Sequence, residues 1–182
     1  MGYVIGVVIA VIIILLIVLY NNMLKKRNKV KTAFSGLDTM LKKRYDLMPN
    51  LVAMVEKYVS HESDVLTRIT KLRSRAQSAK TIDESIKVNQ EIDDAMRSLN
   101  VSVEGYPDLK SSENYLQMQA ALNDVEEQIS AARRTYNANV ETYNTFIGMI
   151  PINIVAIIFG FKPYEQFTAT EQERESKIWV NQ

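Results

Sequence analysis

The first twenty residues, MGYVIGVVIAVIIILLIVLY, carry no charged side chain. As a helix, the segment from Tyr3 to Tyr20 spans about 25 Å at roughly 1.5 Å per residue, which approaches a hydrocarbon core of about 30 Å. Tyrosines at both ends suit the two membrane interfaces. No charged leader precedes this run and no small-x-small cleavage site precedes Asn21, so residues 1–22 are predicted to be a retained transmembrane anchor.

Positive charge follows the apolar run directly. The basic cluster consists of Lys25, Lys26, Arg27, Lys29 and Lys31. The positive-inside rule then predicts a single-pass protein with its N-terminus outside and its body in the cytoplasm. These residues are also predicted to rest on anionic lipid headgroups, and a solvated basic stalk is the alternative.

Heptad spacing dominates the next tract. Two rows repeat every seven residues on both sides of Pro49, and they are Phe34, Leu41, Met48, Val55 and Val30, Leu37, Arg44, Leu51, Tyr58. Because the register does not change, we expect one helix that passes through Pro49 with a kink. The proline removes a hydrogen bond to the carbonyl of Tyr45, so the kink needs a compensating contact.

A second heptad tract predicts a helix of some 35 to 39 residues. Its rows are Tyr115, Leu122, Ile129, Tyr136, Tyr143, Ile150 and Met118, Val125, Ala132, Asn139, Phe146. Between the two tracts, a helical pattern from Val65 pauses near Lys80, where a capping-box pattern begins at Thr81. We therefore predict an all-α protein with an antiparallel bundle of three long helices over residues 23–149. If the chain turns fully near Lys80, the bundle has four helices.

The segment IPINIVAIIFGFKPYEQF follows the bundle. Its apolar run is too short for a second membrane span. Residues 150–167 are expected to pack on the bundle or on a neighbouring subunit, or to dip into a membrane interface. The candidate contact residues are Ile154, Ile157, Phe159 and Phe161, and residues 168–182 are expected to form a polar tail.

The sequence supports no reaction. It has no cysteine and a single histidine, so a thiolate metal site is excluded. His61 and Glu62 begin a zinc-protease pattern, but Val65 occupies the place of its second histidine. The adjacent pairs Asp93, Asp94 and Glu126, Glu127 are interpreted as a solvated acidic face. No catalytic, metal or cofactor residue is predicted, and nucleic-acid binding is not expected because the basic cluster lacks interleaved aromatics.

Basic and acidic residues lie in different parts of the sequence, and this separation suggests contacts between the two parts. Arg44 lies on an apolar register, so it needs a carboxylate on another helix or chain, unless its side chain reaches the bundle edge. Lys42, Lys43 and Arg44, beside Pro49, are candidates to meet the acidic region 83–127 of a neighbour, or that of their own chain.

Tyr136 and Tyr143 either pack in the core with their hydroxyls at the edge or form a lateral recognition surface.

Several motifs together resemble the LemA family of bacterial membrane-anchored helical proteins. They are RYDLMPNLV followed by HE, EGYPDLKSSENYLQMQ, AARRTYNANVETYN and NIVAIIFGF. The resemblance implies an anchored antiparallel bundle in the bacterial inner membrane and brings no catalytic residue with it. Magnetosome proteins that look like LemA imply, by analogy, a role in membrane organisation.

The sequence therefore predicts a non-enzymatic, membrane-anchored scaffold. It is expected to self-associate as a homo-oligomer on the lipid bilayer and to organise membrane or recruit partners, because anchors held in one plane strengthen weak lateral contacts. The alternative is a small-oligomer adaptor that docks on an unidentified membrane enzyme or protease.

Overall fold

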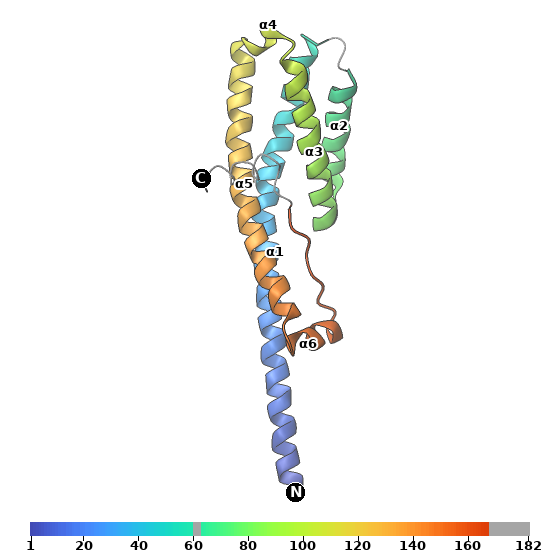
Figure 1. Cartoon of the computed structure of the whole chain (residues 1–182), viewed down its shortest axis with the longest axis vertical. Coiled ribbons are helices and arrows are strands. Elements are labelled where there is room, and N and C mark those ends of the chain that lie inside the picture. Colours follow the sequence, from blue (N-terminus) through green and yellow to red (C-terminus); the bar gives the residue numbers. More distant parts are fainter. Residues whose placement is uncertain (60–62, 168–182) are drawn as a thin grey trace, which may run out of the picture. The chain divides into compact units, whose positions relative to one another are not determined.

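The computed structural model describes residues 1–59 and 63–167, and every regular element in them is a helix. Figure 1 shows them in chain order, and their bounds are α1 (Gly2–Glu56), α2 (Ser63–Ser78), α3 (Ile82–Val103), α4 (Pro107–Lys110), α5 (Glu113–Gly148) and α6 (Ile152–Ile158). The predicted all-α class is confirmed. His61 and Glu62, which begin the incomplete zinc-protease pattern, lie outside the described residues.

The chain divides into two compact units, and each is described by itself. The first unit is Met1–Val30 with the described part of Tyr136–Gln182, and the second is Lys31–Thr135. Helices α1 and α5 contribute residues to both. The predicted boundaries at residues 22, 149 and 167 stay predictions.

In the second unit, the middle tract is two helices and not one. Helices α2 and α3 pack side by side, and the chain leaves helical geometry between Ser78 and Ile82. The hydroxyl of Thr81 accepts a hydrogen bond from the N–H of Glu84 (3.1 Å), and the Glu84 carboxylate accepts one from the N–H of Lys80 (3.0 Å). This cap starts a new helix, so the preferred three-helix bundle with a bend was wrong and the four-helix alternative holds.

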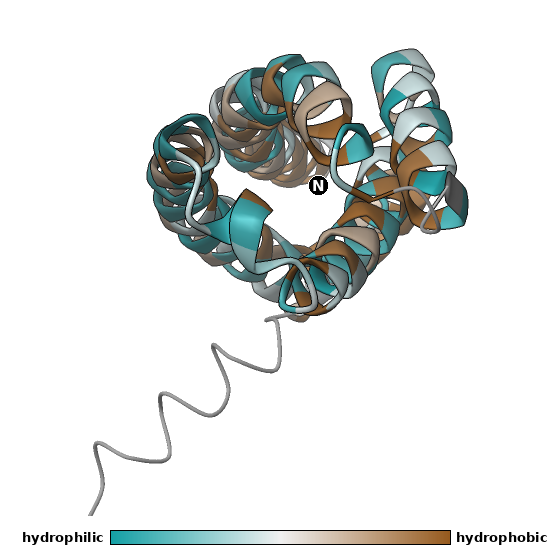
Figure 2. Cartoon of the chain, turned by 90° about the horizontal axis from the view of Figure 1, so that it is seen from above, coloured by the Kyte–Doolittle hydropathy of each residue, from teal (hydrophilic) through white to brown (hydrophobic). Residues whose placement is uncertain are grey.

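Helix α1 passes through Pro49 as expected, and its apolar rows are buried on both sides of it. Leu37, Leu41, Leu51 and Val55 are among the core residues, whereas Tyr58 lies beyond the end of the helix and is exposed. Figure 2 shows hydrophobic and hydrophilic residues alternating around the helices, as amphipathic packing requires.

Helix α5 has 36 residues, which confirms the predicted length. Tyr115, Ile129, Tyr136 and Tyr143 of its first heptad row are buried. Ile150, the last predicted member of that row, lies beyond the helix and is exposed, because the chain turns after Gly148. The heptad pattern was therefore extended one step too far.

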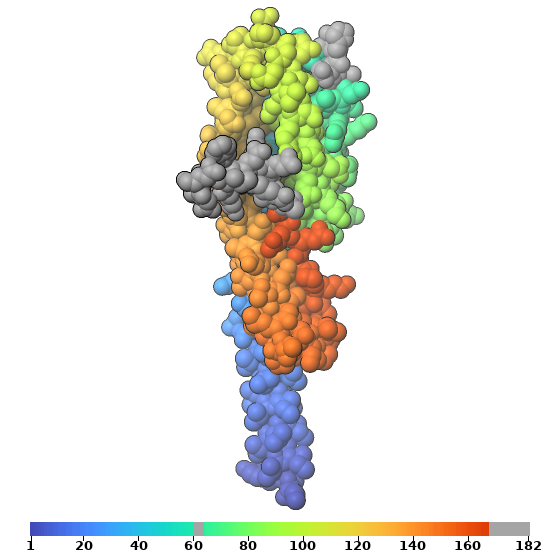
Figure 3. All heavy atoms as spheres, viewed as in Figure 1, coloured from blue at the N-terminus to red at the C-terminus, as the bar shows by residue number. Residues whose placement is uncertain are grey.

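In the first unit, the apolar start of α1 packs against none of the residues that the structure describes. Side chains from Met1 to Val18 are exposed, and Figure 3 shows this blue segment without other atoms against it on the visible face. It is long and apolar enough to cross a membrane. Packing begins near Tyr20, where Phe159 and Phe161, just after α6, contact α1.

Candidate functional site

Arg44 is the centre of a polar network in the second unit. Its side chain is 1% exposed. Nη1 donates to Asp93 Oδ1 in α3 (2.6 Å) and to Glu126 Oε1 in α5 (2.9 Å), and Nη2 donates to Asn89 Oδ1 (2.6 Å). One arginine on α1 thus holds α3 and α5 together through charge-assisted hydrogen bonds.

A second arginine completes the balance of charge. Arg133 Nη2 donates to Asp93 Oδ2 (2.8 Å), so each oxygen of Asp93 accepts from a different guanidinium. The formal charges of Arg44, Arg133, Asp93 and Glu126 cancel. Buried charges are tolerated when they are paired and hydrogen-bonded in this way.

Asn89 connects the ion pairs to a tyrosine. Its Oδ1 accepts from the hydroxyl of Tyr45 (2.8 Å) as well as from Arg44, and its Nδ2 donates to the carbonyl of Ser85 (2.8 Å). Burial raises the pKa of Tyr45 above its ordinary value, which keeps the hydroxyl protonated as a donor. For Arg44, burial lowers the pKa, but the charges on Glu126 and Asp93 outweigh it and the pKa is raised.

These contacts decide two of the sequence expectations. Arg44 has carboxylate partners on other helices of its own chain, and its side chain does not reach the bundle edge. The interpretation of the acidic pairs as a solvated face was wrong for Asp93, which is 13% exposed, whereas Glu126 is 44% exposed and binds Arg44 from the surface. Adjacent helical residues point in different directions, so Asp93 turns inward while Asp94 is exposed.

Pro49 creates a second polar contact in this unit. Because proline has no N–H, the carbonyl of Tyr45 lacks its usual helical donor. Arg73 Nε in α2 donates to that carbonyl instead, at 2.8 Å. The proline thus leaves an acceptor on α1 that α2 uses.

Lys42 and Lys43 are exposed beside this network. Lys42 Nζ lies 2.7 Å from Asp38 Oδ2, and Lys43 Nζ donates to Gln128 Oε1 at 3.4 Å. Both contacts are on the surface, where such pairs contribute little to stability. Their role at a subunit contact stays a prediction.

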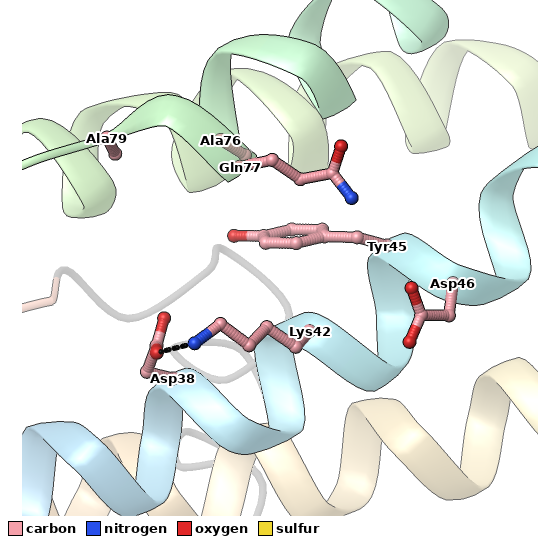
Figure 4. Close-up of a pocket in the computed structure, with 7 residues that line it drawn as sticks. All are labelled: Asp38, Lys42, Tyr45, Asp46, Ala76, Gln77 and Ala79. Atoms are coloured by element: carbon pink, nitrogen blue, oxygen red, sulfur yellow. Dashed lines mark ion pairs between the residues drawn. The ribbon is translucent and has the colours of Figure 1, made fainter.

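A groove of about 420 Å³ opens beside Lys42 (Figure 4). Its lining comes from two segments, and the residues are Asp38, Lys42, Tyr45, Asp46, Ala76, Gln77 and Ala79. The Lys42 ammonium is paired with Asp38, and the Tyr45 hydroxyl donates to Asn89. Among the described residues, no group of three or more His, Cys, Asp or Glu side chains is arranged to hold a metal ion.

In the first unit, α5 carries a tyrosine–asparagine ladder, which consists of Tyr136, Asn137, Tyr143 and Asn144. Both tyrosine hydroxyls donate to backbone carbonyls, Tyr136 to Glu165 (2.9 Å) and Tyr143 to Lys162 (3.0 Å). The tyrosine rings are buried, as the core alternative expected.

Each asparagine of the ladder holds one residue through two hydrogen bonds. Asn144 donates to the carbonyl of Tyr164 (2.9 Å) and accepts from its N–H (3.0 Å), and Asn137 does the same with Phe167 (2.8 and 3.0 Å). A heptad advances about 10.5 Å along a helix, and three extended residues cover about 10 Å. This match lets one repeated dipeptide bind the backbone of residues 162–167 twice.

Aromatic rings of α1 and of the residues after α6 contact one another in the first unit. The Tyr20 ring lies 5.1 Å from that of Phe159 and 5.6 Å from that of Phe161, measured between centroids. Arg27 lies 5.1 Å from the centroid of the Phe161 ring. The basic cluster is therefore partly engaged in cation–π contacts, since Lys26 also lies over Phe146 (4.9 Å).

The remaining members of the basic cluster, Lys25, Lys29 and Lys31, are exposed. Helix α6 buries Ile152, Val155 and Ala156. On its other side, Ile154, Ile157, Ile158 and Phe159 are exposed, and we call these four residues the apolar face of α6. Of the four predicted contact residues in this segment, Phe161 alone is buried.

Ser85, Asn89 and Asp93 were not predicted as a set from the sequence. They lie four residues apart on α3, so they share one face with the buried Ile92. That spacing is a usable signal, because polar residues repeating along an apolar stripe need a buried partner. Arg44 is that buried partner, because it donates to both Asn89 and Asp93.

Comparison with known proteins agrees with this architecture. The family model described as "LemA family" matches residues 33–181. Protein LemA of Metamycoplasma hominis is 28% identical over 155 residues, which cover 85% of this chain and 71% of the relative.

Magnetosome proteins are also similar. Magnetosome protein MamQ of Magnetospirillum gryphiswaldense is 25% identical over 174 residues, and Magnetosome protein MamQ 1 of Paramagnetospirillum magneticum is 27% identical over 174 residues. Each match covers 81% of this chain and 64% of the relative, which is less than two thirds of the relative's length. Because the family model spans most of the chain, including the polar network and the tyrosine–asparagine ladder, the protein belongs to the LemA family.

Proposed function

We propose that the protein is a membrane-anchored helical scaffold that self-associates and organises a patch of membrane or recruits partners to it. The observation that carries this proposal is the continuity of α1. One helix begins in the exposed apolar segment and continues past Val30 into the buried rows of the second unit. A single element thereby serves as anchor and as part of the packed body.

The polar network supports a structural role for the body. Its guanidinium and carboxylate groups bind one another, and the Tyr45 hydroxyl is occupied by Asn89. A catalytic group would need to reach a substrate. Because these groups bind one another and thereby join helices, they favour a scaffold over an enzyme.

Relatives described as magnetosome proteins fit a scaffold at a membrane, by analogy only.

The basic cluster favours an orientation with the N-terminus outside and the body in the cytoplasm. The chain has no cysteine, so Ser74→Cys, at an exposed position of α2, gives a unique thiol. An impermeant maleimide should leave it unlabelled in intact cells and label it after lysis; labelling in intact cells would reverse the orientation.

Particle size tests self-association. The full-length protein, purified in mild detergent, is measured by light scattering and imaged by negative stain. Large regular particles without any added partner are expected. Monomers or dimers would contradict the scaffold and favour the adaptor, which should form larger particles only with its partner.

A further inference from the structure

The apolar face of α6 is left largely exposed by the described part of the chain. Ile157 is 79% exposed and Ile158 is 71% exposed, while Ile152, Val155 and Ala156 on the other side are buried. Isolated exposed apolar residues are common on proteins. Ile154, Ile157 and Ile158 on α6, with Phe159 directly after it, form a patch that calls for an occupant.

The position of this face beside α1 identifies the occupant. Phe159 contacts Tyr20, which is the last residue of the uncharged apolar run. Every side chain of α1 before Leu19 is exposed. The apolar face of α6 therefore adjoins the lipid-facing surface of the predicted span, at the level where an interfacial tyrosine is expected.

The direction of α6 suits a membrane surface. Helix α6 makes an angle of 97° with α5. The last turns of α5 lie along α1, where Phe146 contacts Lys26, so α6 crosses beside α1 in the same unit (Figures 1 and 3). A helix across the axis of a span lies in the plane of the bilayer, as interfacial helices do.

The end of α6 is built to keep this geometry. Gly160 has φ 70°, its N–H donates to Ile157 (3.2 Å), and the N–H of Phe161 donates to Ala156 (2.9 Å). This is the Schellman arrangement, in which glycine accepts the left-handed conformation. It turns Phe161 into a buried position against Tyr20 and Arg27, while Phe159 contacts Tyr20 and stays half exposed.

Charge around the face is consistent with lipid headgroups. Lys25 and Lys29 are exposed on the turns of α1 that follow Tyr20, and Lys162 is exposed just after α6. Basic residues beside an apolar face are typical of helices that lie on membranes.

We propose that α6 is a second membrane contact, in which Ile154, Ile157, Ile158 and Phe159 insert into the lipid interface beside the point where α1 leaves the bilayer. The proposal rests on the anchoring part of the proposed function and is independent of self-association. The span and α6 then hold the first unit at two points, which fixes its rotation about α1 relative to the membrane surface.

Depth-dependent quenching tests this insertion in the full chain. Single cysteines replace Ile157, Val11 in the span, or Ser74 in the second unit, and each is labelled with the dye NBD. The proteins are reconstituted in vesicles of phosphatidylcholine and phosphatidylglycerol whose acyl chains are brominated either near the headgroup or near the chain end. Ile154→Cys is a second probe of α6, and circular dichroism checks that helix content is retained.

The dye at Ile157 should be quenched more by shallow bromine than by deep bromine. The dye at Val11 should show the opposite order, and the dye at Ser74 should not be quenched. Quenching at Val11 without quenching at Ile157 and Ile154 would overturn the proposal, whether α6 faces water or a second copy of the chain. No quenching at Val11 would overturn the anchor together with the proposal.

Discussion

Arg73 in α2 donates a hydrogen bond from Nε to the backbone carbonyl of Tyr45 in α1, at 2.8 Å. That carbonyl would be bonded to the N–H of residue 49 in a regular helix, but residue 49 is proline. The proline in a long helix is thus matched by a donor from the helix that packs beside it. Nε of Arg73 therefore provides the compensating contact that the sequence led us to expect at Pro49.

Arg73→Ala tests this compensation. Removing the donor should lower the free energy of unfolding by about 1.5 kcal/mol, the lower end of the range for hydrogen bonds to charged groups. The loss should shrink when Pro49→Ala is also present, because the Tyr45 carbonyl then regains a helical donor. Thermal unfolding followed by circular dichroism measures both. Arg75→Ala, which breaks an exposed pair with Glu91, is the matched control, and an equal loss in both backgrounds would contradict the compensation.

Arg44→Met tests the polar network. The substitution leaves Asp93 and Glu126 without their shared cation, and breaking a buried pair costs about 3 kcal/mol or more. For a chain of this size, the melting temperature should fall by about 6 to 12 °C. Arg44→Lys should recover only part of the loss, because an ammonium cannot reproduce the forked contacts. Lys42→Met removes an exposed cation as a control, and a similar small effect for Arg44→Met would show that the network contributes little.

The heptad rows predicted the long helices, because each long helix buries a continuous apolar stripe. Such a stripe appears in the sequence as a repeat of seven residues. They placed Arg44 on an apolar row, leaving open whether its side chain reaches the bundle edge, and they predicted the length of α5. They did not identify Asp93 or Glu126 as its partners, because helical periodicity describes one helix at a time. Which face of α3 meets which face of α1 depends on packing between helices, which a single sequence does not record.

The partners of the ladder and the orientation of α6 were not predicted, for different reasons. The repeat of Tyr136 and Asn137 at Tyr143 and Asn144 is visible in the sequence, but residues 162–167, which the ladder holds, have no periodic pattern. In α6, a short run of apolar residues does not indicate which side chains are buried. The turns at Gly148 and Gly160 make that choice.

Alkaline pH should weaken the second unit through Tyr45. Burial raises its folded pKa above the usual value of about 10, so the unfolded chain loses this proton first. The corresponding stabilisation is complete below about pH 10 and is lost as the pH rises through the folded pKa. Thermal unfolding across this range should show a shallower decline for Tyr45→Phe than for the parent chain. Equal slopes would mean that Tyr45 ionises as readily in the folded state.

Asn144→Ala should release one rung of the ladder. The N–H of Tyr164 donates to Asn144 Oδ1, so its hydrogen exchange should accelerate on the order of tenfold, as expected for a bond of about 1.4 kcal/mol. The N–H of Phe167, held by Asn137, should change less, and Asn137→Ala should reverse the pattern. Peptide-resolved hydrogen exchange can compare the two variants. Equal acceleration at both amides would indicate that the segment is released as one unit.

Charge reversal at Lys42 and Lys43 should weaken self-association and leave the fold intact. Arg44 is buried and held by carboxylates of its own chain, whereas Lys42 and Lys43 are exposed and make surface contacts only, so these two are the members of the triplet placed to meet the acidic region of a neighbour. The double variant Lys42→Glu with Lys43→Glu should give smaller particles by light scattering, with unchanged helix content by circular dichroism. Lys71→Glu with Lys87→Glu, at exposed positions of α2 and α3, applies the same change of net charge elsewhere. Particles that shrink equally in both variants would assign the effect to net charge and remove Lys42 and Lys43 from the contact.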